Sequence, residues 1–152
     1  MKHLGITGTR KGMTERQKDM LAHLIAVCVP HQFYTFHDGD CVGVDIEARR
    51  MAWDWTYKLI VHPSTATTRA FLKLGGEEFR EPKPPLVRNK DIVDECDLLV
   101  ACPGGDHEEL RSGTWACIRY GRKVKRRTII IWPGGELSIY PEGYNGRERS
   151  EG

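Results

Sequence analysis

The sequence of 152 residues has no apolar run long enough to span a bilayer. Its first residues lead into a charged position and a strand-like run, and the apolar core of a signal peptide is missing. These two absences argue against a membrane protein and against a secreted one. We therefore expect a cytoplasmic protein that does not use a membrane as a partner.

The sequence also lacks paired cysteines and metal-binding spacings. Its five cysteines form no CxxC pair, and their odd number leaves one over from any full disulfide pairing. Structural thiols are expected, because a free cysteine in an apolar run behaves as a small hydrophobic residue. The six histidines follow no metal spacing. His37 and His107 lie at predicted strand ends or in their loops, and neither is given a role. We expect no metal and no cofactor.

No excess of charge of either sign is present. The net charge is +2 with 29% charged residues, so composition gives no reason to expect a nucleic-acid ligand. The one strong cluster is the basic run from Arg119 to Arg127. A run of this kind is more often a solvated helix end, and the aromatic residues typical of single-strand binders are sparse around it. Nucleic acid is therefore not the expected partner.

Apolar, strand-like runs alternate with helical periodicities along the chain. Strands are predicted at residues 4–6, 32–37, 57–62, 98–102 and 128–132, with helices from about 14 and 44 and over 89–95 and 112–120. Continuous apolar strands that alternate with helices are typical of a parallel sheet covered on both faces. The sequence predicts a three-layer α/β/α sandwich with a mostly parallel, Rossmann-like sheet of about five or more strands.

The predicted domain is a single unit over residues 1–135. Between Pro63 and Val87 the periodicity is weak, and only Thr67 to Leu74 is predicted to be helical. A connection of this length inside a compact domain is usually a lid or a binding loop. Residues 136–152 are rich in Gly, Glu, Arg and Ser and have little apolar content, so we expect a C-terminal loop or a partly disordered tail.

A glycine-rich turn follows the first predicted strand. Gly8, Thr9 and Arg10 separate this strand from a helix whose Thr14 and Gln17 form a capping-box pattern. In such a unit, the backbone N–H groups of the turn and the positive helix end hold anions, most often phosphate. A tight turn that needs glycine for its dihedral angles alone looks the same. The turn makes nucleotides the first ligands to consider.

A second glycine-rich segment follows the next predicted strand. It contains Gly39, Asp40, Gly43 and Asp45, a GDxxGxD pattern at the start of the second helix. Glycines allow close approach of the backbone, and a carboxylate near a helix start accepts hydrogen bonds from ribose or stabilises that helix end. Both aspartates therefore have a structural interpretation, as helix caps, beside the functional one.

A third segment contains Arg88 and Asn89, followed by Lys90, before a short predicted helix. An arginine there can grip a phosphate through two hydrogen bonds, and Asn89 can cap the helix or read a base edge. A solvated arginine is the alternative. Because Pro84 and Pro85 stiffen the approach, we favour a positioned Arg88.

A fourth segment follows the predicted strand at residues 98–102. It consists of two short motifs, Pro103, Gly104 and Gly105, and then Ser112, Gly113 and Thr114 at the start of the next helix. The carboxyl ends of parallel strands meet at one edge of a sheet, where ligands bind. We therefore expect the glycine-rich segments to converge in space.

The order of these four segments resembles the SLOG superfamily of Rossmann-like nucleotide-binding proteins, which includes the LONELY GUY phosphoribohydrolases and the DNA-processing protein A domain. The resemblance covers nearly all of residues 1–133 and is closest to small phage and bacterial members. It implies that Gly8, Thr9 and Arg10 lie against a nucleotide phosphate or sugar, and that Arg88 is functional. It also implies a homodimer.

The last motif departs from the family pattern. LONELY GUY proteins carry PGGxGTxxE, whose final glutamate takes part in cleaving the bond between the base and ribose 5′-monophosphate. Here extra residues separate Gly105 from Ser112, and Ala116 and Cys117 stand where the glutamate is expected. The phosphate-binding half of the motif is retained, and the catalytic carboxylate is absent from its family position.

A retained phosphate motif without its glutamate favours a protein that binds a nucleoside phosphate or a nucleotide-derived signal. The alternative is an N-glycosidase acting on nucleoside 5′-monophosphates, which needs a carboxylate from elsewhere. The candidates for catalysis are Asp40, Asp45, Arg88, Glu108 and Glu109. A nucleic-acid-binding module that uses the basic run is the third hypothesis.

Overall fold

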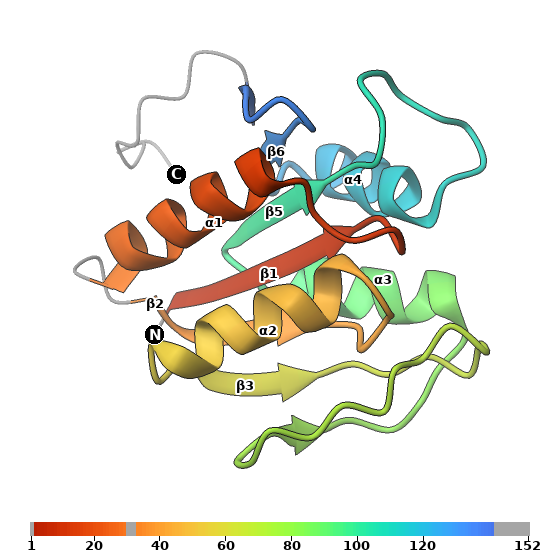
Figure 1. Cartoon of the computed structure of the whole chain (residues 1–152). Coiled ribbons are helices and arrows are strands. Elements are labelled where there is room, and N and C mark those ends of the chain that lie inside the picture. Colours follow the sequence, from red (N-terminus) through yellow and green to blue (C-terminus); the bar gives the residue numbers. More distant parts are fainter. Residues whose placement is uncertain (1, 30–32, 142–152) are drawn as a thin grey trace, which may run out of the picture.

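The computed structural model describes residues 2–29 and 33–141. Strands and helices alternate along this part of the chain (Figure 1). In chain order they are β1 (Lys2–Gly8), α1 (Glu15–Cys28), β2 (Phe33–Asp38), α2 (Val44–Asp54), β3 (Lys58–Val61), β4 (Glu78–Phe79), α3 (Pro85–Glu95), β5 (Leu98–Cys102), α4 (Gly113–Lys123), β6 (Arg127–Ile131) and β7 (Leu137–Tyr140). Among these residues, no helix combines the length and the apolar character needed to cross a membrane.

The strands form one sheet in the order β4-β3-β2-β1-β5-β6-β7. All neighbouring strands are parallel except the last pair, β6 and β7, which is antiparallel. The chain builds outward from β1 to β4 on one side and then crosses back to place β5 on the other side of β1. The strand order therefore reverses between β1 and β5, the position where open α/β sheets bind their ligands.

Helices cover both faces of the sheet. In Figure 1, α1 and α2 lie on one face, and α3 and α4 lie on the other. Leu4, Ile6 and Phe36 are fully or almost fully buried and belong to one apolar cluster, whereas Leu99 and Cys117 pack in a separate cluster. Successive residues of a strand point to opposite faces, so continuously apolar strands can supply both cores. The predicted three-layer sandwich with a mostly parallel Rossmann-like sheet is confirmed.

Helix α1 begins as its capping box predicts. The Thr14 hydroxyl accepts the N–H of Gln17 at 3.1 Å, and the Gln17 side-chain oxygen accepts the N–H of Thr14 at 3.0 Å. The Gln17 amide then donates to the carbonyl groups of Pro103 and Ile131, both at 2.9 Å. A residue that satisfies the helix start thus also joins α1 to the ends of β5 and β6.

The predicted helix from Thr67 to Leu74 is wrong. This segment is irregular, and Phe71 has a φ of 56°, in the left-handed region that a helix cannot accommodate. Its backbone N–H groups at Phe71 and Leu72 donate to the Asp40 carboxylate instead of to helical carbonyls. Local periodicity was therefore overridden by a hydrogen-bond acceptor from a distant part of the sequence.

Two other boundaries differ from the prediction. Helix α3 begins at Pro85 rather than at Asn89, because proline is well suited to the first helical position, where no N–H is needed. The C-terminal segment, predicted as loop from residue 136, contains β7 at Leu137–Tyr140. This edge strand pairs with β6 through its backbone, and its Leu137 and Ile139 side chains are exposed. Residues 142–152 lie outside the described part of the chain.

Gly8 is required by packing at the end of β1. A Cβ atom at this position would lie 2.5 Å from Cβ of Val44, a stiff and fully buried side chain. We expect Gly8→Ala to lower the free energy of unfolding by about 1–3 kcal/mol through overpacking. The control is Gly113→Ala, because a Cβ there meets no atom within 4 Å. Urea unfolding that gives equal stabilities for the two variants would mean that Val44 makes room for the added methyl group at no cost.

Candidate functional site

The turn after β1 is anchored to two other segments through the backbone of Thr9. Its N–H donates to the Cys102 carbonyl at the end of β5, at 3.1 Å. Its carbonyl accepts the N–H of Val44 at 3.1 Å, at the start of α2, and that of Gly12 at 3.3 Å. Arg10 follows with an exposed side chain. The first predicted motif is thus fixed at the junction of β1, β5 and α2.

The glycines of the second motif act as spacers. Gly43 has a φ of 95°, and a Cβ atom there would lie 2.5 Å from the Thr9 carbonyl oxygen. A Cβ atom at Gly39 would collide with the guanidinium of Arg88. Both glycines therefore allow other groups to approach the backbone, as expected from the sequence of this segment.

Arg88 is buried and positioned by four acceptors. Its Nη1 donates to the carbonyls of Gly39 at 2.6 Å and His62 at 3.3 Å, and its Nε donates to Oδ1 of Asn89 at 2.8 Å. Its Nη2 lies 3.6 Å from the Cys41 sulfur. The alternative of a solvated arginine is wrong, and the guanidinium holds the β2–α2 connection against α3.

Asn89 lies within α3 and so does not cap that helix. Its Nδ2 donates to the Gly113 carbonyl at 3.4 Å, which links α3 to the first turn of α4. Ser112 is the residue before α4, and its hydroxyl accepts the N–H of Trp115 at 3.2 Å. This cap is the arrangement that the Ser-Gly-Thr motif predicts, with the positive end of a helix dipole at the site.

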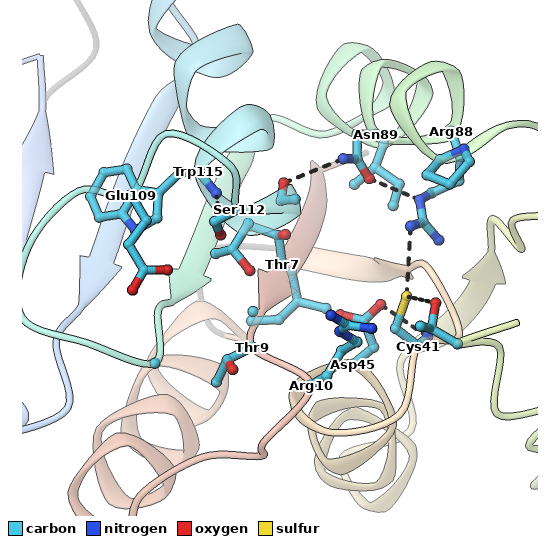
Figure 2. Close-up of a pocket in the computed structure, with 18 of the residues that line it drawn as sticks. Thr7, Thr9, Arg10, Cys41, Asp45, Arg88, Asn89, Glu109, Ser112 and Trp115 are labelled. Carbon is cyan, nitrogen blue, oxygen red and sulfur yellow. Dashed lines mark hydrogen bonds between the residues drawn. The ribbon is translucent and has the colours of Figure 1, made fainter. Parts of the chain in front are cut away.

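These segments surround a cavity of about 430 Å³ beside the end of β1 (Figure 2). Predicted site residues that line it are Gly8, Thr9, Arg10, Asp45, Arg88, Asn89, Gly104, Glu109, Ser112, Gly113 and Thr114. Those that do not are Gly39, Asp40, Gly43, Pro103, Gly105 and Glu108. The charged lining consists of four cations, Arg10, Lys11, Arg88 and Arg111, against two carboxylates, Asp45 and Glu109. This excess of cations favours an anionic ligand.

Several lining residues are not predicted from the sequence: Lys11, Cys41, Thr68, Arg111 and Trp115. Lys11 follows the Gly8–Arg10 turn, and Arg111 and Trp115 flank the Ser112–Thr114 motif. Their positions next to these predicted motifs could have identified them. Thr68 comes from the irregular connection after β3, and no local pattern marks it. That connection therefore contributes to the site, which agrees with the predicted binding loop for part of its length.

Asp45 is the titratable carboxylate buried in the cavity wall. Its Oδ2 accepts the N–H of Gly39 at 3.1 Å and that of Cys41 at 3.2 Å, so it orders the loop before α2 instead of capping the helix. The pKa of Asp45 is raised to about 7, mainly by burial and in part by the Asp38 carboxylate, whereas Arg88 opposes the shift. A carboxyl group with such a pKa in a cavity can give or take a proton near neutral pH.

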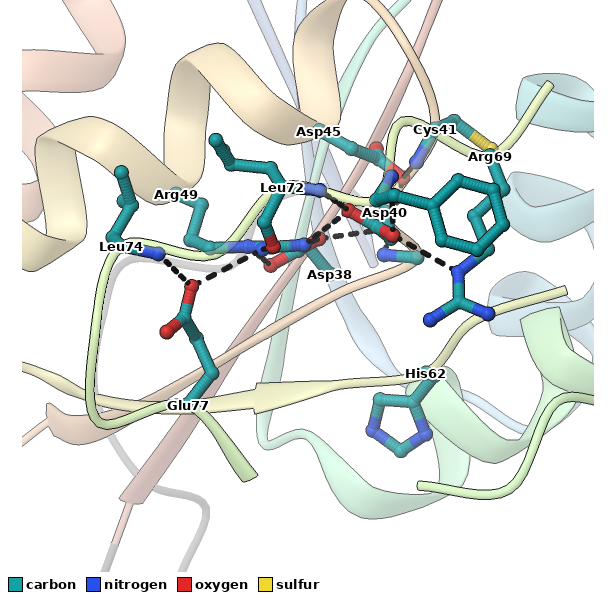
Figure 3. A network of polar contacts seen from close by, with 12 residues as sticks. Asp38, Asp40, Cys41, Asp45, Arg49, His62, Arg69, Leu72, Leu74 and Glu77 are labelled. Atoms are coloured by element: carbon teal, nitrogen blue, oxygen red, sulfur yellow. Dashed lines mark hydrogen bonds and ion pairs between the residues drawn. The ribbon is translucent and has the colours of Figure 1, made fainter. Parts of the chain in front are cut away.

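Asp40 has a structural role, which corrects its assignment as a ligand-binding or catalytic residue. Its carboxylate accepts Nη2 of Arg49 at 2.8 Å, Nε of Arg69 at 3.1 Å and two backbone N–H groups (Figure 3). Arg49 is fully buried and also binds both oxygens of Asp38 at 2.8 Å. Asp40 is therefore saturated with donors outside the cavity, and it holds the segment around residue 71 in place.

The two glutamates of the loop between β5 and α4 differ in position. Glu109 lines the cavity, whereas Glu108 is paired with Arg119 at 3.0 Å and Arg122 at 3.4 Å. Arg119 also donates to the carbonyls of Glu109 at 3.3 Å and Leu110 at 3.0 Å. Arg119 and Arg122 of the basic run thus hold this loop beside the cavity. The sequence pattern predicted a solvated helix end for these cations.

Three histidines lie in a row: His3 on β1, His37 on β2 and His62 directly after β3. Nδ1 of His3 is 2.7 Å from Nε2 of His37, and Nδ1 of His37 is 2.8 Å from Nε2 of His62. Burial is the largest cause that lowers the pKa of His37 to about 3 and that of His62 to about 4, and neighbouring positive charges contribute to both shifts. No sequence pattern identifies this row, because its members come from β1, β2 and the end of β3.

The raised pKa of Asp45 predicts a pH dependence of stability. Between the ordinary value of 3.8 and about 7, the folded state keeps the Asp45 proton that the unfolded state has lost. The contribution of Asp45 to the free energy of unfolding therefore falls as the pH rises, by about 2–3 kcal/mol from pH 5 to pH 8. Asp45→Asn should remove this component, because an amide oxygen can still accept the two N–H groups.

Urea unfolding at pH 5 and pH 8 measures this effect. The stability of Asp45→Asn relative to the wild type should increase between the two pH values. Asp54→Asn, an exposed change at the end of the same helix, should leave the pH profile of the wild type unchanged. Parallel profiles for the wild type and Asp45→Asn would show that Asp45 is ionised throughout this range.

The chain is similar to known proteins at the level of the fold. No protein-family model and no curated protein matches the sequence. The solved structures that match include TM1055, with a TM-score of 0.63 and 13% identity over 84% of this chain and 72% of the other. DNA processing protein A from Streptococcus pneumoniae has a TM-score of 0.62 and 15% identity over 86% of this chain. The match covers 50% of the length of that protein.

The molybdenum cofactor carrier protein from Chlamydomonas reinhardtii is similar to the same degree. Its TM-score is 0.59, with 18% identity over 86% of this chain and 76% of the carrier chain. All three have SLOG-type Rossmann-like folds. The strand order and the similarity to these structures confirm the prediction at the level of the fold: the chain has a Rossmann-like α/β fold of the kind seen in these three proteins.

Proposed function

We propose that the chain binds a nucleoside phosphate, or a signal derived from a nucleotide, in the cavity at the switch point. The observation that carries this proposal is the convergence of the Thr9 turn, the start of α4 and four cationic side chains on one cavity. Turn N–H groups and a helix N-terminus favour phosphate, and the cations add to this preference. The SLOG-type fold of the chain is consistent with a nucleotide ligand.

The size and lining of the cavity support a ligand with an apolar part. A volume of about 430 Å³ lies within the usual range of sites for small molecules. Ile6, Leu86, Ile92 and Trp115 contribute apolar surface to the lining, beside the polar residues of the turn and of α4. A nucleoside phosphate combines a flat, weakly polar base with an anionic group, so both kinds of surface have a use.

Binding of AMP, compared with adenosine, tests this proposal. Arg10 and Arg111 are exposed and line the cavity, so their removal should not disturb the fold. Arg10→Ala or Arg111→Ala should weaken AMP binding by about 1.5–3 kcal/mol if the side chain makes a charged hydrogen bond to phosphate. Isothermal titration calorimetry provides the affinities, and adenosine should bind more weakly than AMP to the wild type.

The matched control is Arg50→Ala, which removes an exposed cation of α2 away from the cavity. It should leave the affinity for AMP unchanged. Unchanged affinity in both Arg10→Ala and Arg111→Ala would contradict the proposed site. Binding to an oligonucleotide that exceeds AMP binding and falls steeply with added salt would support the nucleic-acid hypothesis instead. Homodimerisation and a cytoplasmic location stay predictions from the sequence.

A second function, cleavage of the N-glycosidic bond of a nucleoside 5′-monophosphate, is favoured by the position and pKa of Asp45. In this reaction water adds to C1′ of the ribose, and the base leaves with a proton. A carboxyl group can activate the water or stabilise the positive charge that develops on the sugar. Asp45 is the candidate that is both in the cavity wall and buried, whereas Glu109 is exposed.

Chromatography of incubations with nucleoside monophosphates, NAD and ADP-ribose tests this reaction through the release of free base or nicotinamide. If release occurs, Asp45→Asn should lower its rate by at least about 100-fold, the usual contribution of a positioned acid or base. Glu109→Gln should retain most of the rate. A panel without any release would contradict the hydrolase and leave the binding function, whose own test is the affinity for AMP.

A further inference from the structure

A cluster of potential metal ligands lies outside the cavity at the switch point. His37 at the end of β2, His62 after β3 and Glu95 at the end of α3 place one ligand atom each within 4.8 Å of one another. The two histidines are buried, with exposed fractions of 0% and 3%, and Glu95 is partly exposed. None of the three lines the cavity at the switch point.

His3 supplies the support that a metal-binding imidazole requires. Its Nδ1 lies 2.7 Å from Nε2 of His37, on the side of that ring away from His62. If Nε2 of His37 donates this hydrogen bond, Nδ1 of His37 is left with a lone pair directed at the cluster. Histidine ligands are commonly oriented in this way by a partner on the second ring nitrogen.

We propose that His37, His62 and Glu95 form a binding site for a divalent transition-metal ion, with zinc as the reference ion. Two imidazoles and one carboxylate are a common ligand set for zinc and for related ions, and they leave one or more coordination positions open. Magnesium and calcium are disfavoured because they prefer ligand sets made of oxygen atoms.

Two of the three proposed ligands, His62 and Glu95, line a second cavity. This cavity has a volume of about 300 Å³ and is lined by His62, Glu95, Arg80, Lys83 and Asp91, among others. An ion can therefore enter from solvent, and a water molecule or a small anion can complete its coordination. The site is neither sealed nor placed on the outer surface.

Two local changes accompany binding. Nδ1 of His37 and Nε2 of His62 are 2.8 Å apart, whereas tetrahedral bonds of about 2.0–2.1 Å require ligand nitrogens roughly 3.3 Å apart, so the rings separate by about half an ångström. Glu95 is paired with Arg80 through both oxygens, at 2.9 and 3.1 Å. Arg80 competes with the ion for this carboxylate and adds an unfavourable positive charge, so its removal should tighten binding.

Titration of the full chain with Co²⁺, after treatment with a chelator, tests the proposal. We expect one Co²⁺ per chain, with the intense visible absorption of a four- or five-coordinate ion, and displacement by Zn²⁺. Thiolate charge-transfer bands in the near ultraviolet should be absent, since the cluster contains no cysteine. Glu95→Gln should lower the affinity at least about tenfold, and Arg80→Gln should raise it severalfold.

His62→Gln should also abolish the visible bands, and far-ultraviolet circular dichroism shows whether this variant is folded. His107→Gln is the matched control, because it removes an exposed imidazole from the loop after β5 and should bind Co²⁺ as the wild type does. The proposal is overturned if the wild type gives no visible bands, or if Glu95→Gln binds as tightly as the wild type. In the first case the three histidines form a purely structural hydrogen-bonded row.

Discussion

The peptide groups of Thr9 are the contact on which the candidate site depends. They join three segments through hydrogen bonds to the end of β5 and to the start of α2. The surrounding glycines follow from this crowding, since a Cβ at Gly43 would lie 2.5 Å from the Thr9 carbonyl oxygen and one at Gly104 would lie 2.9 Å from the Thr9 hydroxyl. Gly43 and Gly104, which the sequence assigns to ligand-binding motifs, are thus required mainly because a side chain at either position would collide with Thr9. The cavity is the space that remains where these backbones diverge at the β1/β5 switch point.

Buried charge holds the loops around this junction. Arg49 binds Asp38 through two hydrogen bonds and also reaches Asp40 and Glu77, so one guanidinium offsets several carboxylates that would otherwise be costly to bury. Asp38, Asp40 and Arg49 are fully buried, and this burial raises the pKa of Asp38. Breaking such a buried pair typically costs about 3–5 kcal/mol, because the remaining charge is left uncompensated. The network therefore offsets its desolvation cost by fixing the path of the irregular part of the connection that precedes β4.

The sequence predicts those parts of the molecule that depend on local patterns. Continuous apolar runs predicted the central strands, and the capping box predicted Thr14 as the cap of α1. The β7 strand was missed because its apolar alternation, Leu137 and Ile139, spans four residues only, and its pairing with β6 is not visible in the sequence. The false helix near Phe71 and the misassigned role of Asp40 have one common cause, a carboxylate that binds N–H groups 31 and 32 residues away. Contacts of that range are visible only when the chain is folded.

Arg88 shows why the role of a motif residue does not follow from its identity. It lines both cavities, and its Nη1 donates to the carbonyl of Gly39, beside Asp45, and to that of His62, beside the histidine row. Four of its hydrogen-bonding contacts are to protein groups, so its loss would disturb the loop after β2 whether or not a phosphate binds. An effect of substituting Arg88 on ligand binding would therefore combine a structural and a direct contribution. Arg10 and Arg111 are exposed and line the cavity, so they contribute little to the stability of the fold. Substituting them therefore measures the direct contribution to ligand binding alone.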